Sequence, residues 1–267
     1  MNLLTHLSHV ATPATFAALA GIYSTAAVFS GLSGFGFSAI GCLSLLVLPP
    51  PLAIAMLMAL SLATQASSFG SLWSELRRHA LPWNRRDGVV PYLAGGTIGM
   101  PAGLAILALL GARELTAAVG MLLVAYAAWS LFKPAALQLR AAQPARWRSF
   151  LIGAAGGVVG GFSAFPGSAL VVWNGLSGVS KEKGRALTQP FILWMQVVGL
   201  AVVVSTRPGL FDDVFWAVLA AALPLTLLAN ALGVMIYRRT GEVNYRRITF
   251  AALGVTGLGL VVKVMLS

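Results

Sequence analysis

The chain has 267 residues, of which 58% are hydrophobic and only 9% are charged. A soluble domain carries about 25% charged residues, so this composition excludes an ordinary water-soluble fold and requires lipid around most of the surface. The formal net charge of +11 does not indicate a nucleic-acid partner, because the basic residues gather in loops between apolar segments, where they set membrane orientation.

Ten apolar segments follow one another along the chain and are separated by turns rich in Gly and Pro. Two of them, 36–49 and 168–178, are too short to cross a hydrocarbon core of about 30 Å. We expect each to be a half-helix that meets a break near the midplane, or part of a re-entrant hairpin. The predicted fold is an all-α polytopic membrane protein with broken or half-length helices at about 31–49 and 160–178. The ten segments run roughly over 12–32, 36–49, 51–72, 88–110, 114–132, 149–162, 168–178, 186–206, 213–236 and 246–266.

Basic residues predict how these segments are oriented. With ten segments and a periplasmic N-terminus, four Lys/Arg clusters all fall in the cytoplasm, as the positive-inside rule requires. A count of eight segments, with 12–49 and 149–178 fused into single passes, would place the last two clusters outside. We therefore predict a multi-pass protein of the bacterial inner membrane whose linker 133–148 is cytoplasmic. The clusters are Arg77, Arg78, Arg85 and Arg86; Lys133, Arg140, Arg146 and Arg148; Lys181, Lys183 and Arg185; and Arg238, Arg239, Arg246 and Arg247.

Two short stretches of the chain match each other about 130 residues apart. Ser33-Gly-Phe-Gly-Phe-Ser-Ala-Ile40 resembles Ser163-Ala-Phe-Pro-Gly-Ser-Ala-Leu170. We expect a first repeat of five segments at 1–133, a basic linker at 134–148 and a second repeat of five segments at 149–267. Because five is odd, the second repeat is inverted relative to the first. Inverted repeats with matched broken helices are typical of secondary transporters that bind solute between the halves.

The matched breaks are the first candidates for a binding site. An interrupted helix leaves backbone N–H groups without partners, and helix N-termini attract anions. Serine hydroxyls can cap the helix or donate to a ligand oxygen, glycines allow close approach, and the two phenylalanines could form an apolar gate. The alternative is that the small residues serve helix packing and the serines bond their own backbone. The candidates are Ser33, Gly34, Phe35, Gly36, Ser38, Ser163, Phe165, Gly167 and Ser168.

Polar residues inside the apolar segments are the second group of candidates. Gln65 and Gln196 occupy comparable places in the two halves, and Gln189 and Trp194 lie on the same segment as Gln196. A buried amide could bind oxyanion oxygens, or it could form an interhelical hydrogen bond. Arg185, just before that segment, could draw an anion toward the site or could only determine topology.

The ionisable residues argue for an anion rather than a cation. All seven carboxylates fall in loops or at segment ends, so no embedded Asp or Glu is available as a proton relay. Cys42 is the single cysteine, and the three histidines show no ligand spacing. We therefore expect no metal, no cofactor and no catalytic residue.

The chain resembles the TauE/SafE sulfite exporter family of bacterial membrane transporters over nearly its whole length. The resemblance implies movement of small sulfur-containing anions such as sulfite or organosulfonates. One difference is that Ser-Gly-Phe-Gly-Phe stands where the family has consecutive glycines, which suggests a different pocket or gate. The motifs that carry the resemblance are Gly31–Gly36, Tyr92–Gly103 with its Gly-x-Pro-x-Gly core, Met121–Ser130, the spaced glycines Gly153, Gly157, Gly160 and Gly161, Gly184-Arg-Ala186, and Leu223-Pro224 to Gly233.

The sequence therefore predicts a secondary transporter that moves a small anion, sulfite or an organosulfonate, by alternating access. The alternatives are an anion channel-like pore of the same fold and a membrane assembly subunit that transports nothing. A membrane enzyme is disfavoured, because no Walker A loop, zinc-protease motif or CxxC occurs. The expected partners are the solute, the lipid bilayer and a possible second copy of the chain.

Overall fold

The computed structural model describes residues 12–70, 73, 77–78, 88–132, 145–239 and 242–266, with the backbone alone for Lys181, Arg238 and residues 242–249. Over these residues the chain is helical and contains no strand. The elements in chain order are α2 (Pro13–Ser33), α3 (Phe37–Gly41), the 3₁₀ helix η1 (Cys42–Leu46), α4 (Pro50–Phe69), α6 (Val90–Leu109), α7 (Ala112–Phe132), α8 (Arg146–Ser163), α9 (Gly167–Leu176), α10 (Lys181–Thr206), the 3₁₀ helix η4 (Pro208–Leu210), α11 (Asp213–Arg239) and α12 (Glu242–Leu266).

In the part of the chain that the structure describes, six helices are long and apolar enough to cross a membrane, namely α2, α4, α6, α7, α10 and α11. The stretch Phe37–Leu46, which consists of α3 followed by η1, is a shorter apolar helix, as expected for segment 36–49. Helix α9 has only 10 residues and corresponds to the other short segment. These findings confirm the prediction of an all-α polytopic membrane protein.

Helix α10 begins five residues earlier than the predicted segment 186–206. The prediction followed hydropathy and assigned the basic residues to a loop. The helix instead begins at Lys181, because the Ser180 hydroxyl accepts a hydrogen bond from the backbone N–H of Lys183 at 3.4 Å and caps the first turn. The earlier start places Arg185 within the helix.

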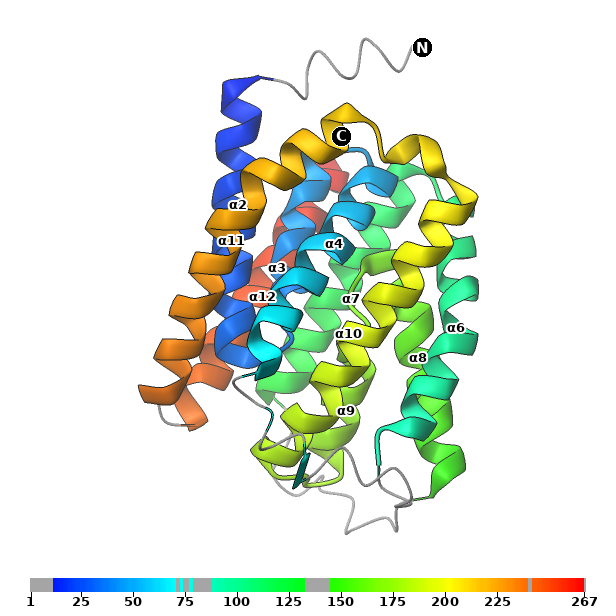
Figure 1. Ribbon diagram of the computed structural model, residues 1–267, viewed down its shortest axis with the longest axis vertical. Helices are drawn as coiled ribbons and strands as arrows, with labels where there is room; N and C mark the ends of the chain where they lie inside the picture. The colour runs from blue at the N-terminus through cyan, green and yellow to red at the C-terminus, as the bar shows by residue number, and fades with distance from the viewer. Residues whose placement is uncertain are drawn as a thin grey trace.

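Three pairs of helices pack through glycines that let the two backbones approach each other closely. In Figure 1, α2 lies beside α11 and α6 lies beside α8. A β-carbon at Gly31 of α2 would meet the carbonyl oxygen of Asn230, and one at Gly157 of α8 would meet that of Gly96. In the third pair, α7 with α12, Gly120 and Gly257 face each other. Each pair joins a helix from residues 12–132 to one from residues 145–266.

Helices α3 and α4 lie in the interior of the bundle. Every residue of α3 is buried, and Ile54, Met56 and Leu57 of α4 are fully buried. Helix α10 packs against α4, with Gly199 lying against the side chain of Met58. The short segment α3 and the buried glutamines of α4 and α10 therefore lie in the packed interior of the bundle.

Part of the predicted topology falls on residues that the structure does not describe. Arg85 and Arg86 lie outside the described residues, and so does most of the linker 134–148. The cytoplasmic orientation and the division into repeats therefore stay predictions.

Candidate functional site

The first helix break lies between α2 and α3. Helix α2 ends at Ser33, and Gly34 takes a left-handed conformation with φ 82° and donates its N–H to the carbonyl oxygen of Ser30. The Ser33 hydroxyl donates to the carbonyl oxygen of Phe29 at 2.7 Å and accepts from the N–H groups of Phe35 and Gly36 at 3.3 and 3.0 Å. This serine therefore bonds backbone groups on both sides of the break.

The second break, between α8 and α9, repeats this arrangement. Helix α8 ends at Ser163, and Ala164 is left-handed with φ 54°, the one non-glycine with positive φ among the described residues. The Ser163 hydroxyl donates to the carbonyl oxygen of Val159 at 2.6 Å and accepts from the Phe165 N–H at 3.3 Å. Ser168, in the first turn of α9, donates through its hydroxyl to the carbonyl oxygen of Phe165 at 3.1 Å.

These contacts define what the serines can offer a ligand. A hydroxyl has a single proton, and Ser33 and Ser163 each give theirs to a carbonyl of their own helix. In this arrangement they cap the helix ends rather than point a donor into open space. Ser38, buried in α3, is matched by Ser168 at the start of α9.

A buried glutamine from a neighbouring helix holds each break. Gln65 of α4 donates through Nε2 to the carbonyl oxygen of Gly34 at 3.0 Å. Gln196 of α10 donates to the carbonyl oxygen of Ala164 at 3.1 Å and to the Ser61 hydroxyl at 3.2 Å. Both amides therefore satisfy the carbonyl of a left-handed residue at a helix end, a group that is costly to leave unpaired in a membrane.

The two breaks meet at an aromatic contact. The rings of Phe35 and Phe165 are stacked, with centroids 6.3 Å apart and planes inclined by 23°. Tyr126 of α7 lies edge-on to Phe165 at 5.6 Å, and Phe250 of α12 lies 6.1 Å from Phe35. Cys42 adds a contact across the breaks, from its thiol to the carbonyl oxygen of Ser163 at 3.6 Å. The predicted pair of phenylalanines is thus brought together inside the bundle.

The remaining candidates fall into two groups. Gln189 is buried beside Gly34. At Gly167, a β-carbon would press against Ile192, which shows that α9 approaches α10 closely. Trp194 points elsewhere: it is 43% exposed, and its indole N–H donates to the hydroxyl of Thr97 at 3.0 Å. Residues two apart on a helix face different ways, which separates Trp194 from Gln196.

Arg185 is buried inside the bundle, a position that the sequence pattern did not predict. It is only 7% exposed, and it is the one charged residue among the buried side chains that the structure describes. Its Nη2 donates to the carbonyl oxygen of Gly31 at 3.2 Å, and its guanidinium carbon lies 4.1 Å from the ring centroid of Tyr237. The sequence assigned this residue to a basic cluster, and the signal that could have moved it into the helix was the capping Ser180.

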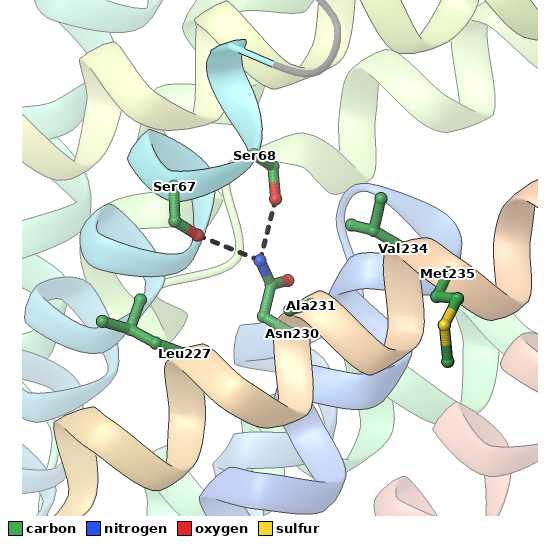
Figure 2. Close-up of a pocket in the computed structure, with 7 residues that line it drawn as sticks. All are labelled: Ser67, Ser68, Leu227, Asn230, Ala231, Val234 and Met235. Carbon is green, nitrogen blue, oxygen red and sulfur yellow. Dashed lines mark hydrogen bonds between the residues drawn. The ribbon is translucent and has the colours of Figure 1, made fainter.

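A pocket of about 300 Å³ lies between α4 and α11, and none of the predicted site residues lines it. Figure 2 shows the Asn230 amide nitrogen pointing at the hydroxyls of Ser67 and Ser68, at 3.1 and 2.8 Å. Asn230 therefore joins α11 to α4 at the edge of this space, which the sequence pattern did not predict. The pocket is lined by Ser67, Ser68, Leu227, Asn230, Ala231, Val234 and Met235.

Comparison with known proteins gives one match. The family model described as Sulfite exporter TauE/SafE matches residues 17–260. No curated protein matches the chain, and no solved structure does. The matched range includes both breaks, Arg185 and the buried glutamines Gln65, Gln189 and Gln196.

Proposed function

The chain belongs to the sulfite exporter TauE/SafE family of membrane transporters, and on this premise we propose that it is a secondary transporter of a small anion. The proposed solute is sulfite or an organosulfonate, and the proposed location is the bacterial inner membrane. The proposed binding region lies between the two helix breaks, where Gln65, Gln196, Ser38 and Ser168 are buried and no carboxylate is among the buried side chains that the structure describes.

The observation that carries this proposal is the matched geometry of the two breaks. Gly34 and Ala164 are both left-handed, follow a capping serine and receive a glutamine amide on their carbonyl oxygen. Each is followed by a phenylalanine, and the two rings stack. Two interrupted helices that meet inside a membrane bundle form the kind of site that secondary transporters place between their repeats.

The packing of the helices supports an arrangement of two corresponding halves. If the first half is exchanged for the second, α2 corresponds to α8 and α6 to α11. The contact between α2 and α11 then becomes the contact between α8 and α6. The contact between α7 and α12 stays the same, because the exchange turns each of these two helices into the other. This is the contact pattern of two halves related by a twofold axis. We propose that rocking of one half against the other parts Phe35 from Phe165 and exposes the solute to each side in turn.

Counterflow into proteoliposomes tests this function. Vesicles loaded with unlabelled sulfite, sulfonates, sulfate or carboxylates are diluted into labelled solute, and a carrier concentrates the label transiently inside. We expect sulfite or a sulfonate to support counterflow. Flux that does not saturate and does not exchange labelled for unlabelled solute would instead favour a channel-like pore. The absence of both flux and binding for every anion would favour an assembly subunit.

A further inference from the structure

The guanidinium of Arg185 is buried with two of its three nitrogens unsatisfied. Nη2 donates to the carbonyl oxygen of Gly31, but Nε and Nη1 have no hydrogen-bond partner. No ion pair joins Arg185 to a carboxylate among the side chains that the structure describes. A buried cation without a counter-charge is costly, and buried charges in proteins are normally paired. This arrangement is therefore suited to a ligand that supplies the missing negative charge.

The unsatisfied nitrogens lie beside the first break. A β-carbon at Gly34 would lie 3.1 Å from Nε of Arg185 and 3.2 Å from Nε2 of Gln189. Two donors from successive turns of α10 thus converge on the same backbone position. The guanidinium carbon lies 4.1 Å from the ring centroid of Tyr237, within the range of a cation–π contact. Arg185 therefore has a bond to Gly31 and a ring contact, while Nε and Nη1 have no hydrogen-bond partner.

We propose that Arg185 and Gln189 form the anion-binding subsite of the proposed transporter, and that it takes a singly charged oxyanion of the sulfonate type. This inference rests on the proposed function and names the solute's charge. One guanidinium neutralises one negative charge, and a divalent anion such as sulfate would leave a net charge in a region of low dielectric. The oxygens of a sulfonate can accept from guanidinium and amide donors together.

The subsite belongs to one half of the protein only. The spacing of about 130 residues that relates the two breaks leads from Arg185 to Ile54 and Ala55, which are apolar and buried. The solute is therefore bound next to the first break, off the centre where Phe35 meets Phe165. Gln65, Gln196, Ser38 and Ser168 belong to the rest of the proposed binding region, and the unmatched Arg185 selects the charge.

Titration calorimetry with purified full-length protein in gluconate buffer tests the subsite, with methanesulfonate, sulfite and sulfate as probes. Arg185→Gln should weaken methanesulfonate binding about ten- to hundredfold, the loss that corresponds to hydrogen bonds with a charged group. Lys183→Gln is the matched control, because it removes the same charge from the same end of α10. It should change the affinity less than about twofold, since Lys183 is only partly buried and charges near the protein surface interact weakly. Wild-type protein should bind methanesulfonate at least about tenfold more tightly than sulfate.

Gln189→Glu keeps the proposal testable if Arg185→Gln does not fold. The new carboxylate lies beside the unsatisfied nitrogens, so it should pair with Arg185, raise thermal stability and abolish methanesulfonate binding. Failure of Gln189→Glu to fold, or binding as tight as wild type in either variant, would overturn the role of Arg185. Sulfate bound as tightly as methanesulfonate would overturn the charge selection. Wild-type protein that binds neither methanesulfonate nor sulfite would instead contradict the proposed function itself.

Discussion

The side-chain amide of Gln196 donates to the carbonyl oxygen of Ala164 at 3.1 Å and thereby ties α10 to the left-handed residue that ends α8. The same amide reaches the Ser61 hydroxyl of α4. One buried side chain thus holds three helices at the second break. Gln65 forms the equivalent bond to Gly34 at the first break.

Gln196→Leu should destabilise the protein by about 1 kcal/mol, because it removes the donor of two buried hydrogen bonds and leaves a carbonyl unpaired. It should also slow anion counterflow. Thermal unfolding in detergent and transport in vesicles measure the two effects. Trp194→Phe is the control, since it removes one hydrogen bond from an exposed side chain of the same helix. If both variants lost the same amount of thermal stability and counterflow activity, the hydrogen bonds of Gln196 would not be important at the break.

The double substitution Ser38→Ala with Ser168→Ala should weaken anion binding about tenfold, as the loss of one or two hydroxyl hydrogen bonds implies, and should leave the fold intact. Ser205→Ala is a matched control, because Ser205 also bonds a carbonyl three residues earlier but is exposed on α10. Calorimetry reports affinity and circular dichroism reports helix content. An unchanged affinity would remove these two serines from the binding region.

Glycine at the α6–α8 contact should not tolerate a methyl group. A β-carbon at Gly157 would meet the carbonyl oxygen of Gly96, so Gly157→Ala must push two backbones apart. We expect a loss of about 1–3 kcal/mol, typical of overpacking, seen as a lower midpoint of thermal unfolding. Gly21→Ala on α2 is the control, because a β-carbon at Gly21 would have no atom within 4 Å. It should be neutral or slightly stabilising, and a similar loss in both variants would contradict close packing at Gly157.

The positions of the breaks could be predicted from the sequence, because Gly34 and the Pro166-Gly167 pair interrupt long apolar runs. The matching serines and phenylalanines also indicated that the breaks correspond. Burial of Arg185 could not be predicted, because hydropathy groups it with Lys181 and Lys183. Its environment depends on contacts of its side chain with Gly31 of α2 and Tyr237 of α11, which are tertiary contacts that no local pattern encodes. The hydrogen bonds from Asn230 to Ser67 and Ser68 could not be predicted either, because they too depend on the packing of two helices.

The membrane orientation is tested by single cysteines in a Cys42→Ser background. Arg85→Cys and Lys183→Cys should both react with an impermeant maleimide only from the cytoplasmic face of oriented vesicles. The reason is that ten segments place both basic clusters on that side. A cysteine at Arg207, on the predicted opposite side, serves as the control. Labelling of Arg85→Cys and Lys183→Cys from opposite faces would contradict the ten-segment orientation.

The central claim is that solute passes where the two breaks meet, and locking that contact tests it most directly. Phe35→Cys and Phe165→Cys, combined with Cys42→Ser, place two thiols where stacked rings now touch. Bridging the thiols by oxidation or with a short bis-thiol reagent should stop anion counterflow, and reduction should restore it, while either single cysteine treated in the same way stays active. A bridged protein that exchanges its anion at the unbridged rate would contradict the claim.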